Sequence, residues 1–459
     1  MEEKDLVIIG SGPGGHAAAL RASDLGASVA IIEADLPGGN CVNFGCLPNT
    51  VMLETARARI AAQELALAGV LSLGEGASFS RAAARKNRIV GGISDGIRNQ
   101  LRGRGIELVE GAARFVSPRS LAVSLKGGGA IDLSARAFVI AAGARPPPPA
   151  LPGYSGEVLV MDQALRLPEA PSSALFLGGG PEGLGFALEQ AFVLAAFGTS
   201  ATVVDGSDDP LPGADREMVD YLLQALSAAG VRVLLSAAVK EVNGEGVGRE
   251  ALVAAAGSSD ERVAAEVIAA PDCRRPHFEG LGLAEAGVNT SEDGITVDER
   301  CRTNIEHILA VGDVTGRPMF SSAAMLQGRV AAENVLGLAS RVRLSALPRA
   351  LHTEPELAWV GLNEAQAREQ GLDVRIGIAD LAANSSAAAR GRPEGAVKLL
   401  AAPDGEILGV HALGPGAGEL IGLAAQAMAL ENTVDELADI AHWHPSLNEA
   451  LVEAARNLR

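Results

Sequence analysis

Residues 6–33 read LVIIGSGPGGHAAALRASDLGASVAIIE, an apolar run followed by a glycine-rich turn, an alanine-rich run and a second apolar run. The pattern predicts a strand over 6–9, a turn over 10–15, a helix over 16–25 and a strand over 28–32. Strand, turn, helix and strand in this order form a βαβ unit, the building block of a parallel sheet.

The glycines of this turn satisfy the G-x-G-x-x-G rule for dinucleotide binding. Gly10 permits the tight turn, Gly12 lets the backbone approach a pyrophosphate, and Gly15 lets helix and strand pack closely. Glu33, at the end of the second strand, can hydrogen-bond a ribose diol, and the helix N-terminus faces the phosphates with its partial positive charge. A purely structural turn is the alternative, but strand, helix and acid are all in place, so we expect a dinucleotide site.

A second copy of the pattern occurs near the middle of the chain. Gly178, Gly180 and Gly183 follow an apolar run and precede a helical one, and Asp205 ends the next predicted strand. A structural turn is again the alternative. No Arg or Lys occurs between Asp205 and Arg216. A 2′-phosphate would therefore meet negative charge, and the segment predicts NAD rather than NADP.

Composition narrows the class of protein. The 459 residues carry 56 acidic and 38 basic side chains, a net charge of −18, which argues against nucleic-acid or anionic-membrane partners. With 55 glycines and 3% aromatic residues, the chain is typical of an α/β enzyme. No stretch reaches 18 uninterrupted apolar residues, and the amino terminus resembles no targeting segment, so we expect a cytoplasmic protein.

Four cysteines occur, and two of them are close in sequence. A regular helix would place Cys41 and Cys46 about 140° apart around its axis, too far to bridge. A glycine at 45 makes an irregular turn inexpensive, so a disulfide is sterically reasonable. Two unrelated buried cysteines are the alternative reading. Cys273 and Cys301 stand alone and are expected to be structural, and we nominate no metal ligands.

Residues 38–48, GGNCVNFGCLP, resemble the redox-disulfide motif of the flavin-dependent pyridine nucleotide-disulfide oxidoreductases. The two glycine motifs stand in that family's order, FAD first and NAD(P) second. Residues 141–146, AAGARP, and 311–314, VGDV, resemble its other flavin motifs. The resemblance covers nearly the whole chain and implies FAD contacts, beyond the first glycine motif, at Asn40, Ala113, Ala141, Gly143, Gly312 and Asp313.

The resemblance extends to the carboxy terminus, where residues 353–361, TEPELAWVG, and 442–449, HWHPSLNE, are similar to the family's dimerisation domain and catalytic segment. The implied fold class is α/β, with two Rossmann-like dinucleotide-binding domains and a carboxy-terminal α+β dimerisation domain. The expected boundaries are 1–145 with 271–340 for a discontinuous FAD-binding domain, 146–270 for the NAD-binding domain and 341–459 for the dimerisation domain.

The family's chemistry assigns roles to four side chains. Cys41 would be the interchange thiol that meets the substrate, and Cys46 the thiol in charge-transfer contact with the flavin. His444 would be the acid-base catalyst, with Glu449 orienting it. In this family the histidine comes from the partner subunit, so a homodimer is implied. A serine at 446 followed by Glu449 is also a capping-box pattern, and the glutamate could cap the last helix as well.

Two positions depart from the family pattern together. Members usually carry a Lys where this chain has Thr50, and a Glu where it has Gly185. In the family these residues pair beside the flavin N5. The absence of both the Lys and the Glu avoids leaving one buried charge without its partner. The absence of a cation beside the flavin N5 is expected to lower the flavin potential.

The leading expectation is an FAD enzyme that passes electrons from a dihydrolipoyl dithiol to Cys41 and Cys46, then to FAD and NAD⁺. The lipoyl group would belong to a carrier protein or acyltransferase component. A second interpretation is an NADH-dependent reductase of another disulfide or persulfide in sulfur metabolism. A third is a flavoprotein of low turnover, kept as a redox sensor or structural subunit.

Overall fold

The computed structural model describes residues 3–74, 76–147, 151, 154–160, 162–180, 183–257, 259–270, 274–316 and 318–458. These residues fall into two compact units. The first lies within 1–51, 83–148 and 273–344, and the second within 52–82, 149–272 and 345–459. The three-domain boundaries expected from the sequence stay a prediction, and part of the proline run at 146–149 lies outside the described residues.

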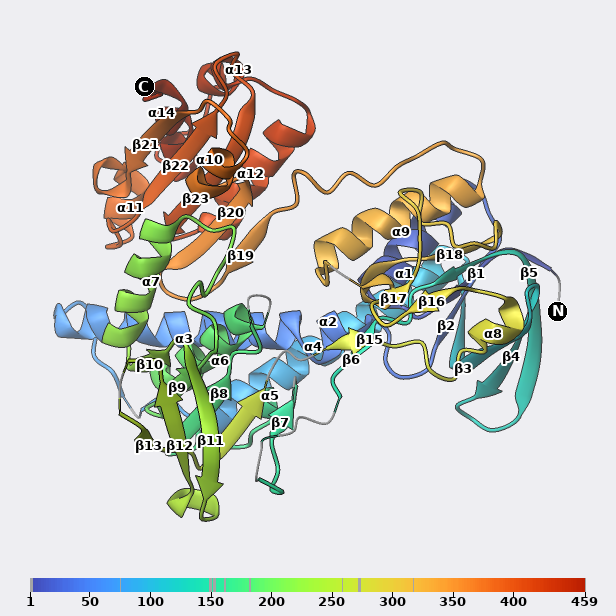
Figure 1. Cartoon of the computed structure of the whole chain (residues 1–459), viewed down its shortest axis with the longest axis horizontal. Helices are drawn as coiled ribbons and strands as arrows, with labels where there is room; N and C mark the ends of the chain where they lie inside the picture. The colour runs from blue at the N-terminus through green and yellow to red at the C-terminus, as the bar shows by residue number, and fades with distance from the viewer. Residues whose placement is uncertain are drawn as a thin grey trace. The chain divides into compact units, whose positions relative to one another are not determined.

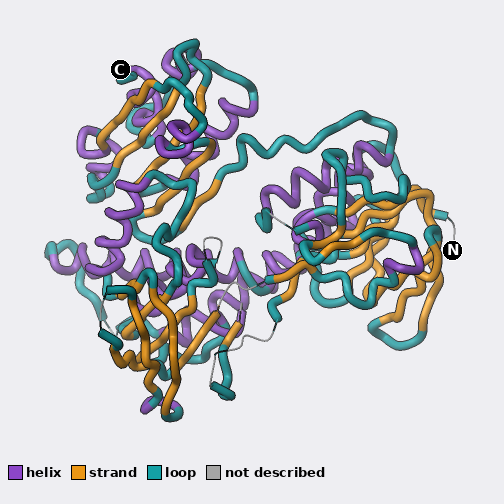
Figure 2. Tube along the Cα trace, viewed as in Figure 1, coloured by secondary structure: helices purple, strands orange, loops and turns teal. Residues whose placement is uncertain are grey.

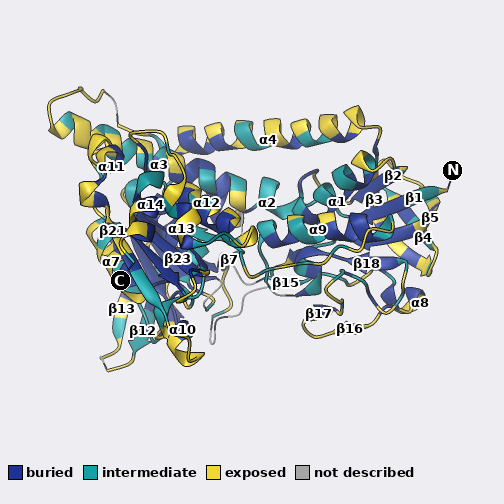
Figure 3. Ribbon diagram, turned by 90° about the horizontal axis from the view of Figure 1, so that it is seen from above, coloured by how far each residue is buried: buried dark blue, intermediate teal, exposed yellow. Residues whose placement is uncertain are grey.

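The first unit is built on a parallel sheet that contains the first glycine motif. Its strands run in the spatial order β3, β2, β1, β5, β18, and β4 joins β3 to β5 as an antiparallel extension. The central strands are apolar because both faces are covered, and β1 and β18 are buried (Figure 3). The strands are β1 (Lys4–Ile9), β2 (Val29–Glu33), β3 (Glu107–Ser117), β4 (Ser120–Leu125), β5 (Ala130–Ile140) and β18 (Ile308–Ala310).

Two helices, α1 (Pro13–Asp24) and α9 (Ser321–Val335), lie side by side in this unit (Figure 1). A Cβ at Gly328 of α9 would come within 2.0 Å of the Gly14 carbonyl oxygen of α1. Only glycine fits this crossing, so the middle of α9 is fixed against the amino-terminal end of α1.

The remaining elements of the first unit are short, apart from two helices that continue into the second unit. These two are α3 (Cys46–Leu67) and α4 (Phe79–Gly103), and Figure 3 shows α4 exposed along much of its length. The short elements are α2 (Gly39–Asn43), β6 (Ala144–Arg145), β15 (Arg275–Pro276), α8 (Leu283–Ala286), β16 (Thr290–Ser291), β17 (Gly294–Ile295) and a 3₁₀ turn over Gly312–Thr315.

The second unit holds the second glycine motif on another parallel sheet. Its order is β10, β9, β8, β14, β7, and a three-stranded antiparallel sheet, β11-β12-β13, follows β10 in the chain. The bounds are β7 (Leu159–Val160), α5 (Asp162–Leu165), β8 (Ser173–Leu177), α6 (Leu184–Ala196), β9 (Ser200–Val204), α7 (Arg216–Ala228), β10 (Val231–Leu234), β11 (Ala237–Asn243), a 3₁₀ turn (Gly246–Gly248), β12 (Glu250–Ala255), β13 (Glu261–Ala264) and β14 (Val267–Ala270).

The carboxy-terminal part of the second unit is an antiparallel sheet, and Figure 2 shows helices beside its strands. The strand order is β19, β20, β23, β22, β21, and α12 and α14 pack against it. The bounds are β19 (Arg349–Leu351), β20 (Glu356–Gly361), α10 (Glu364–Glu369), β21 (Arg375–Asp380), a 3₁₀ turn (Leu381–Ala383), α11 (Ser385–Ala389), β22 (Ala396–Ala401), β23 (Ile407–Gly414), α12 (Ala417–Ala429), α13 (Val434–Asp439) and α14 (Asn448–Arg456).

A buried charge cluster joins α7 to this antiparallel sheet. The Lys398 ammonium on β22 lies 2.7 Å from Asp215, the N-cap of α7, and 2.8 Å from Glu364 of α10. The lysine side chain is only 5% exposed. Burial alone would lower the pKa of Lys398, but hydrogen bonds and charge interactions with the two carboxylates outweigh it and raise the pKa. The ammonium therefore stays charged and fixes α7 to β22.

Among the helices of the described residues, none combines the length and apolar character that a bilayer span requires.

Candidate functional site

The first glycine turn is so tight that Gly10 and Gly15 leave no room for a side chain. Gly10 has a φ of +99°, and a Cβ there would lie 2.3 Å from the Ala141 carbonyl oxygen. A Cβ at Gly15 would lie 1.9 Å from the Gly10 carbonyl oxygen. Gly12 is the N-cap of α1 and supplies no side-chain cap, so the first amides of the helix point toward the turn. Backbone amides at a helix N-terminus suit a pyrophosphate.

Glu33, at the end of β2, stabilises this turn by hydrogen bonds. Its Oε2 accepts hydrogen bonds from the Ser11 backbone N–H at 2.9 Å and from the Ser11 hydroxyl at 2.5 Å. Its Oε1 accepts from the Asp35 backbone N–H at 2.8 Å. The Ser11 hydroxyl oxygen in turn accepts from the Gly38 N–H at 3.2 Å. The predicted ribose acid is therefore buried beside the glycines, and it also holds them in place.

The other residues expected at the FAD site lie in different parts of the first unit. The Ala141 N–H donates to the Ile9 carbonyl at 2.8 Å, directly beside the glycine turn. Gly143 has a φ of +74° and open space within 4 Å of where a Cβ would stand. The Asn40 amide donates to the Ala144 carbonyl at 2.7 Å. Ala113 is a buried residue of β3, within the hydrophobic core of the unit.

The turn after β18 carries the last expected flavin residues. The Gly312 N–H donates to the Gln327 side-chain carbonyl at 2.7 Å. The Asp313 carboxylate is paired with Arg274 at 2.8 Å, and the same guanidinium donates to the Met319 carbonyl at 3.3 Å. An open glycine, a helix N-terminus and polar groups at the strand ends fit an FAD bound across this edge of the sheet.

The two close cysteines lie where the helix breaks, as their spacing predicts. Cys41 belongs to α2, and Cys46 is the first residue of α3. Between them the chain leaves the helix, and the N–H groups of Phe44 and Gly45 both donate to the Asn40 carbonyl at 2.8 Å. The break brings the two side chains together: both are thiols, and they hydrogen-bond to each other.

The two thiols have opposite acidities. A hydrogen bond donated by Cys41, with a further one from Ser321, lowers the pKa of Cys46 to about 6. The same bond to Cys46, together with burial, raises the pKa of the Cys41 thiol. The sulfur of Cys46 lies 3.5 Å from the Ser321 hydroxyl, and Arg274 adds positive charge near both sulfurs. Cys46 is therefore the thiolate of the pair at neutral pH.

The second glycine motif repeats the construction of the first. The Gly178 N–H donates to the Val204 carbonyl at 2.9 Å, as the Gly10 N–H does to Ile32 at 2.8 Å. Asp205 is buried; its Oδ2 accepts from the Gly180 N–H at 2.9 Å and its Oδ1 from the Ser207 N–H at 2.8 Å.

The end of this motif leads into α6. Gly180 has a φ of +80° and open space around it, and Gly183 is the N-cap of α6. Pro181 and Glu182 lie outside the described residues. The open turn, the helix N-terminus and the acid fit a second dinucleotide.

His444 and Glu449 form a hydrogen-bonded pair near the carboxy terminus. Nδ1 of the imidazole lies 2.9 Å from Oε1 of the carboxylate. The other carboxylate oxygen accepts from the Ser446 N–H at 2.8 Å. These bonds, the backbone one first, lower the pKa of Glu449. The side chain of Ser446 makes no capping bond to α14, so only the glutamate half of the expected capping box forms.

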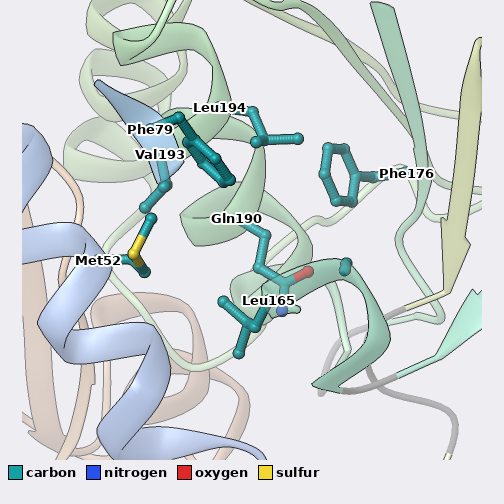
Figure 4. Close-up of a pocket in the computed structure, with 8 residues that line it drawn as sticks. Met52, Phe79, Leu165, Phe176, Gln190, Val193 and Leu194 are labelled. Atoms are coloured by element: carbon teal, nitrogen blue, oxygen red, sulfur yellow. The ribbon is translucent and has the colours of Figure 1, made fainter. Parts of the chain in front are cut away.

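A cavity of about 10 Å³ lies between α3, α5 and α6, with Gln190 among apolar side chains (Figure 4). Its volume suits about one water molecule, not a cofactor. The amide oxygen and nitrogen of Gln190 are buried and have no protein partner among the described residues.

Sequence reasoning missed four polar residues: Ser11, Arg274, Ser321 and Gln327. Arg274, Ser321 and Gln327 reach the site from segments to which we assigned no motif. Ser11 had a local signal, because it occupies a variable position of the glycine turn beside Glu33. Cys301 is buried, its structural role stays a prediction, and Cys273 lies outside the described residues.

Two family models match the chain. Residues 4–328 match the pyridine nucleotide-disulphide oxidoreductase model, and residues 347–455 match the dimerisation domain of the same family. Together they cover the two dinucleotide motifs, the cysteine pair and the carboxy-terminal sheet, and they confirm the expected fold class. The dimerisation-domain match supports a homodimer.

Curated relatives and solved structures agree with these matches. The chain is 35% identical to a dihydrolipoyl dehydrogenase of Thermus scotoductus, over 100% of this chain and 98% of the relative, and 32% identical to one of Geobacillus stearothermophilus, over 99% and 96%. It resembles the structure of LpdA from Mycobacterium tuberculosis with a TM-score of 0.88 and 27% identity, covering 98% of both chains. A TM-score of 0.86, at 27% identity and 99% coverage of both chains, relates it to the HOCl-induced flavoprotein disulfide reductase RclA from Escherichia coli. The chain therefore belongs to the pyridine nucleotide-disulphide oxidoreductase family, as a flavoprotein disulfide oxidoreductase of the lipoamide dehydrogenase type that uses FAD and NAD(H).

Proposed function

We propose that the protein oxidises a dihydrolipoyl dithiol on a carrier protein and passes the electrons to NAD⁺. The observation that carries the proposal is the pair of hydrogen-bonded thiols, Cys41 and Cys46, in the unit that also holds the first dinucleotide turn. The curated relatives described above are named dihydrolipoyl dehydrogenase and match along the whole chain. The acid at Asp205 and the acidic residues after it favour NAD.

The overall reaction balances with two electrons. A dihydrolipoyl dithiol gives up two electrons and two protons and forms its disulfide. NAD⁺ takes the two electrons with one proton as NADH, and the second proton goes to solvent. In between, the Cys41–Cys46 disulfide is reduced to two thiols by exchange with the substrate and is formed again when the electrons leave. Bound FAD supplies the two-electron chemistry that links the sulfur pair to NAD⁺.

The two cysteines have different tasks in this proposal. Cys41, whose thiol pKa is raised, is the interchange sulfur that bonds to substrate sulfur, and its thiolate takes up a proton when it leaves the mixed disulfide. Cys46, whose pKa is lowered to about 6, is the thiolate that leaves in the exchange and faces the flavin. The opposite acidities fit this division of work, because a low-pKa thiol is the better leaving group.

His444 is the proposed base, and it acts in the active site of the partner subunit. The Glu449 carboxylate accepts a hydrogen bond from Nδ1–H of His444, which fixes the tautomer and leaves Nε2 to take the proton of the attacking substrate thiol. The histidine side chain is 69% exposed in the single chain, so its imidazole is accessible to another subunit. In the proposed homodimer, each exchange site thus combines Cys41 and Cys46 of one subunit with the His444–Glu449 pair of the other.

A second candidate is an NADH-dependent reductase of another disulfide. Thr50 and Gly185 stand where the family usually has its Lys and Glu, which favours a lower flavin potential and the reducing direction. RclA, one of the structures to which the chain is similar, is described as a flavoprotein disulfide reductase.

Steady-state assays separate the two candidates. We expect NAD⁺ reduction with a lipoyl carrier protein to be at least about tenfold more efficient, in kcat/KM, than with free dihydrolipoamide, since contacts with the carrier add binding energy. NADH oxidation by glutathione disulfide or coenzyme A disulfide should be slow. Rapid NADH-dependent reduction of one of these disulfides, with no activity on any dihydrolipoyl substrate, would overturn the proposal in favour of the second candidate.

A further inference from the structure

Two helices begin close to the sulfur atom of Cys46. Cys46 is the first residue of α3, which has 22 residues, and Ser321 is the first residue of α9, which has 15. The Ser321 hydroxyl lies 3.5 Å from the Cys46 sulfur, within the range of a sulfur hydrogen bond. The two residues are 275 positions apart in sequence, so only the fold brings them together.

We propose that the Ser321 hydroxyl donates a hydrogen bond to the Cys46 thiolate of the reduced protein, and so stabilises the charged sulfur of the pair. This inference rests on the proposed function, in which the pair is reduced and reoxidised in each turnover. A thiolate can only accept hydrogen bonds, and the serine O–H is a donor that rotates to suit it.

The packing of α9 holds the hydroxyl in position. The close crossing of Gly328 with Gly14 fixes α9 against α1, and Ala324 of α9 lies 3.1 Å from where a Cβ at Gly312 would stand. The residue before Ser321, Phe320, caps α9 with no side-chain hydrogen bond. The first amides of both helices therefore add positive partial charge at the sulfur.

The charged and titratable groups that face the sulfur pair are few among the described residues of this unit. The thiols of Cys41 and Cys46 face each other, and the Arg274 guanidinium adds positive charge near both. Arg274 is itself paired with Asp313. The carboxylate offsets much of the guanidinium charge, so a neutral donor such as Ser321 carries more of the thiolate stabilisation.

The position of Thr50 fits the same account. It lies one turn along α3 from Cys46, where the family usually has a Lys. Without an ammonium at this position of α3, the Ser321 hydroxyl is a neutral donor that can stabilise negative charge on the Cys46 sulfur. The lowered pKa of Cys46 agrees with this. Among the interactions that lower it, the hydrogen bond from Cys41 contributes most and the hydrogen bond from Ser321 comes next.

The test compares Ser321→Ala with Ser321→Thr and Ser322→Ala. Each holoenzyme is reduced anaerobically by two electrons, and the thiolate–flavin charge-transfer absorbance is followed from about pH 5 to about pH 9, the range that brackets the shifted thiol. We expect a wild-type midpoint near 6. Loss of a hydrogen bond to a charged sulfur should raise the midpoint by about one unit in Ser321→Ala. Ser321→Thr, which keeps the hydroxyl, and Ser322→Ala should match the wild type.

Two outcomes would overturn the inference: an unchanged midpoint in Ser321→Ala, or an equal shift in Ser322→Ala. Thiol counts on the denatured proteins check that every variant is reduced to the same extent. The proposed function fails separately, when the wild-type protein itself gains neither thiols nor a charge-transfer band on reduction. If Ser321→Ala is poorly folded, Ser321→Thr paired with Ser321→Val decides the question, because the two are nearly equal in volume and differ in the hydroxyl.

Discussion

Glu449 binds both His444 and the start of the last helix. One carboxylate oxygen accepts a hydrogen bond from Nδ1 of the imidazole at 2.9 Å, and the other accepts from the Ser446 N–H at 2.8 Å. Glu449 thus anchors the start of a helix, which is a structural role, and at the same time orients a histidine, which is its proposed catalytic role. Because the backbone fixes the carboxylate, the carboxylate can fix the ring.

Replacing the histidine should remove base catalysis and leave the rest intact. We expect His444→Gln to lower kcat for dihydrolipoyl oxidation by about 10²–10⁴-fold, the usual contribution of a positioned base. His442→Gln is the matched control, because this neighbouring histidine has no proposed role. Stopped-flow reduction of the flavin by NADH should be unchanged in both variants. A His444→Gln enzyme with wild-type turnover would exclude the histidine as the base.

Replacing the glutamate should have a smaller effect that depends on pH. The hydrogen bonds to Glu449 lower its pKa, so its charge is present above the ordinary range of a glutamate and is lost only as the pH falls through the lowered value. Glu449→Gln removes the negative charge, so the loss of kcat that follows protonation of Glu449 at low pH should be absent from the variant. A pH-rate profile measures the change, and an unaltered acid limb would contradict the orienting role.

The second nucleotide turn predicts a preference for NADH. Asp208 and Asp209 are exposed and follow Asp205, and we expect kcat/KM for NADH to exceed that for NADPH by at least about tenfold. The double variant Asp208→Asn/Asp209→Asn should narrow the ratio by weakening repulsion of a 2′-phosphate. Initial rates with the two coenzymes give the answer, and a wild-type preference for NADPH would refute the assignment.

The buried Lys398 cluster predicts a large effect on stability. Lys398→Met leaves the buried Asp215 carboxylate without its cation, which costs about 3–5 kcal/mol. Lys240→Met removes an exposed pair with Asp260 and should cost less than about 1 kcal/mol. Denaturant unfolding of the two variants compares these costs. Equal midpoints would show that the cluster contributes little to holding α7 on β22.

The missing family pair predicts a change in flavin potential. A Cβ at Gly185 would meet Leu351 at 3.4 Å, an ordinary contact, so the backbone accepts a side chain there. Thr50→Lys/Gly185→Glu should raise the flavin potential in a spectroelectrochemical titration, because a cation near the ring favours its reduced, negative form. Thr50→Met is the control without charge. A double variant with the wild-type potential would reject the idea.

The sequence predicted those parts of the fold that depend on local sterics. A Cβ at Gly10 or Gly15 would lie too close to a backbone oxygen, so only glycine fits, and the spacing of these glycines can be recognised in the sequence. The same holds for the helix break between the cysteines, because the residue spacing forbids a bridge on a regular helix. The two acids at the strand ends were readable as well, although their bonds to Ser11 and to the Gly180 N–H depend on strand register.

The parts that escaped prediction depend on contacts between distant segments. The Ser321 hydroxyl reaches Cys46 across 275 positions because α9 packs on α1, and Arg274 pairs with Asp313 across 39 positions. Neither residue forms a pattern with its sequence neighbours. Lys398 likewise reads as an ordinary strand lysine until β22 meets α7.

The central claim is that Cys41 and Cys46 exchange two electrons with the bound flavin, and anaerobic titration with NADH tests it most directly. After one equivalent of NADH per flavin, the account predicts a charge-transfer band and two new thiols, which alkylation and peptide mass spectrometry assign to Cys41 and Cys46. Bleaching of the flavin by that first equivalent, with no newly alkylated cysteine, would contradict it.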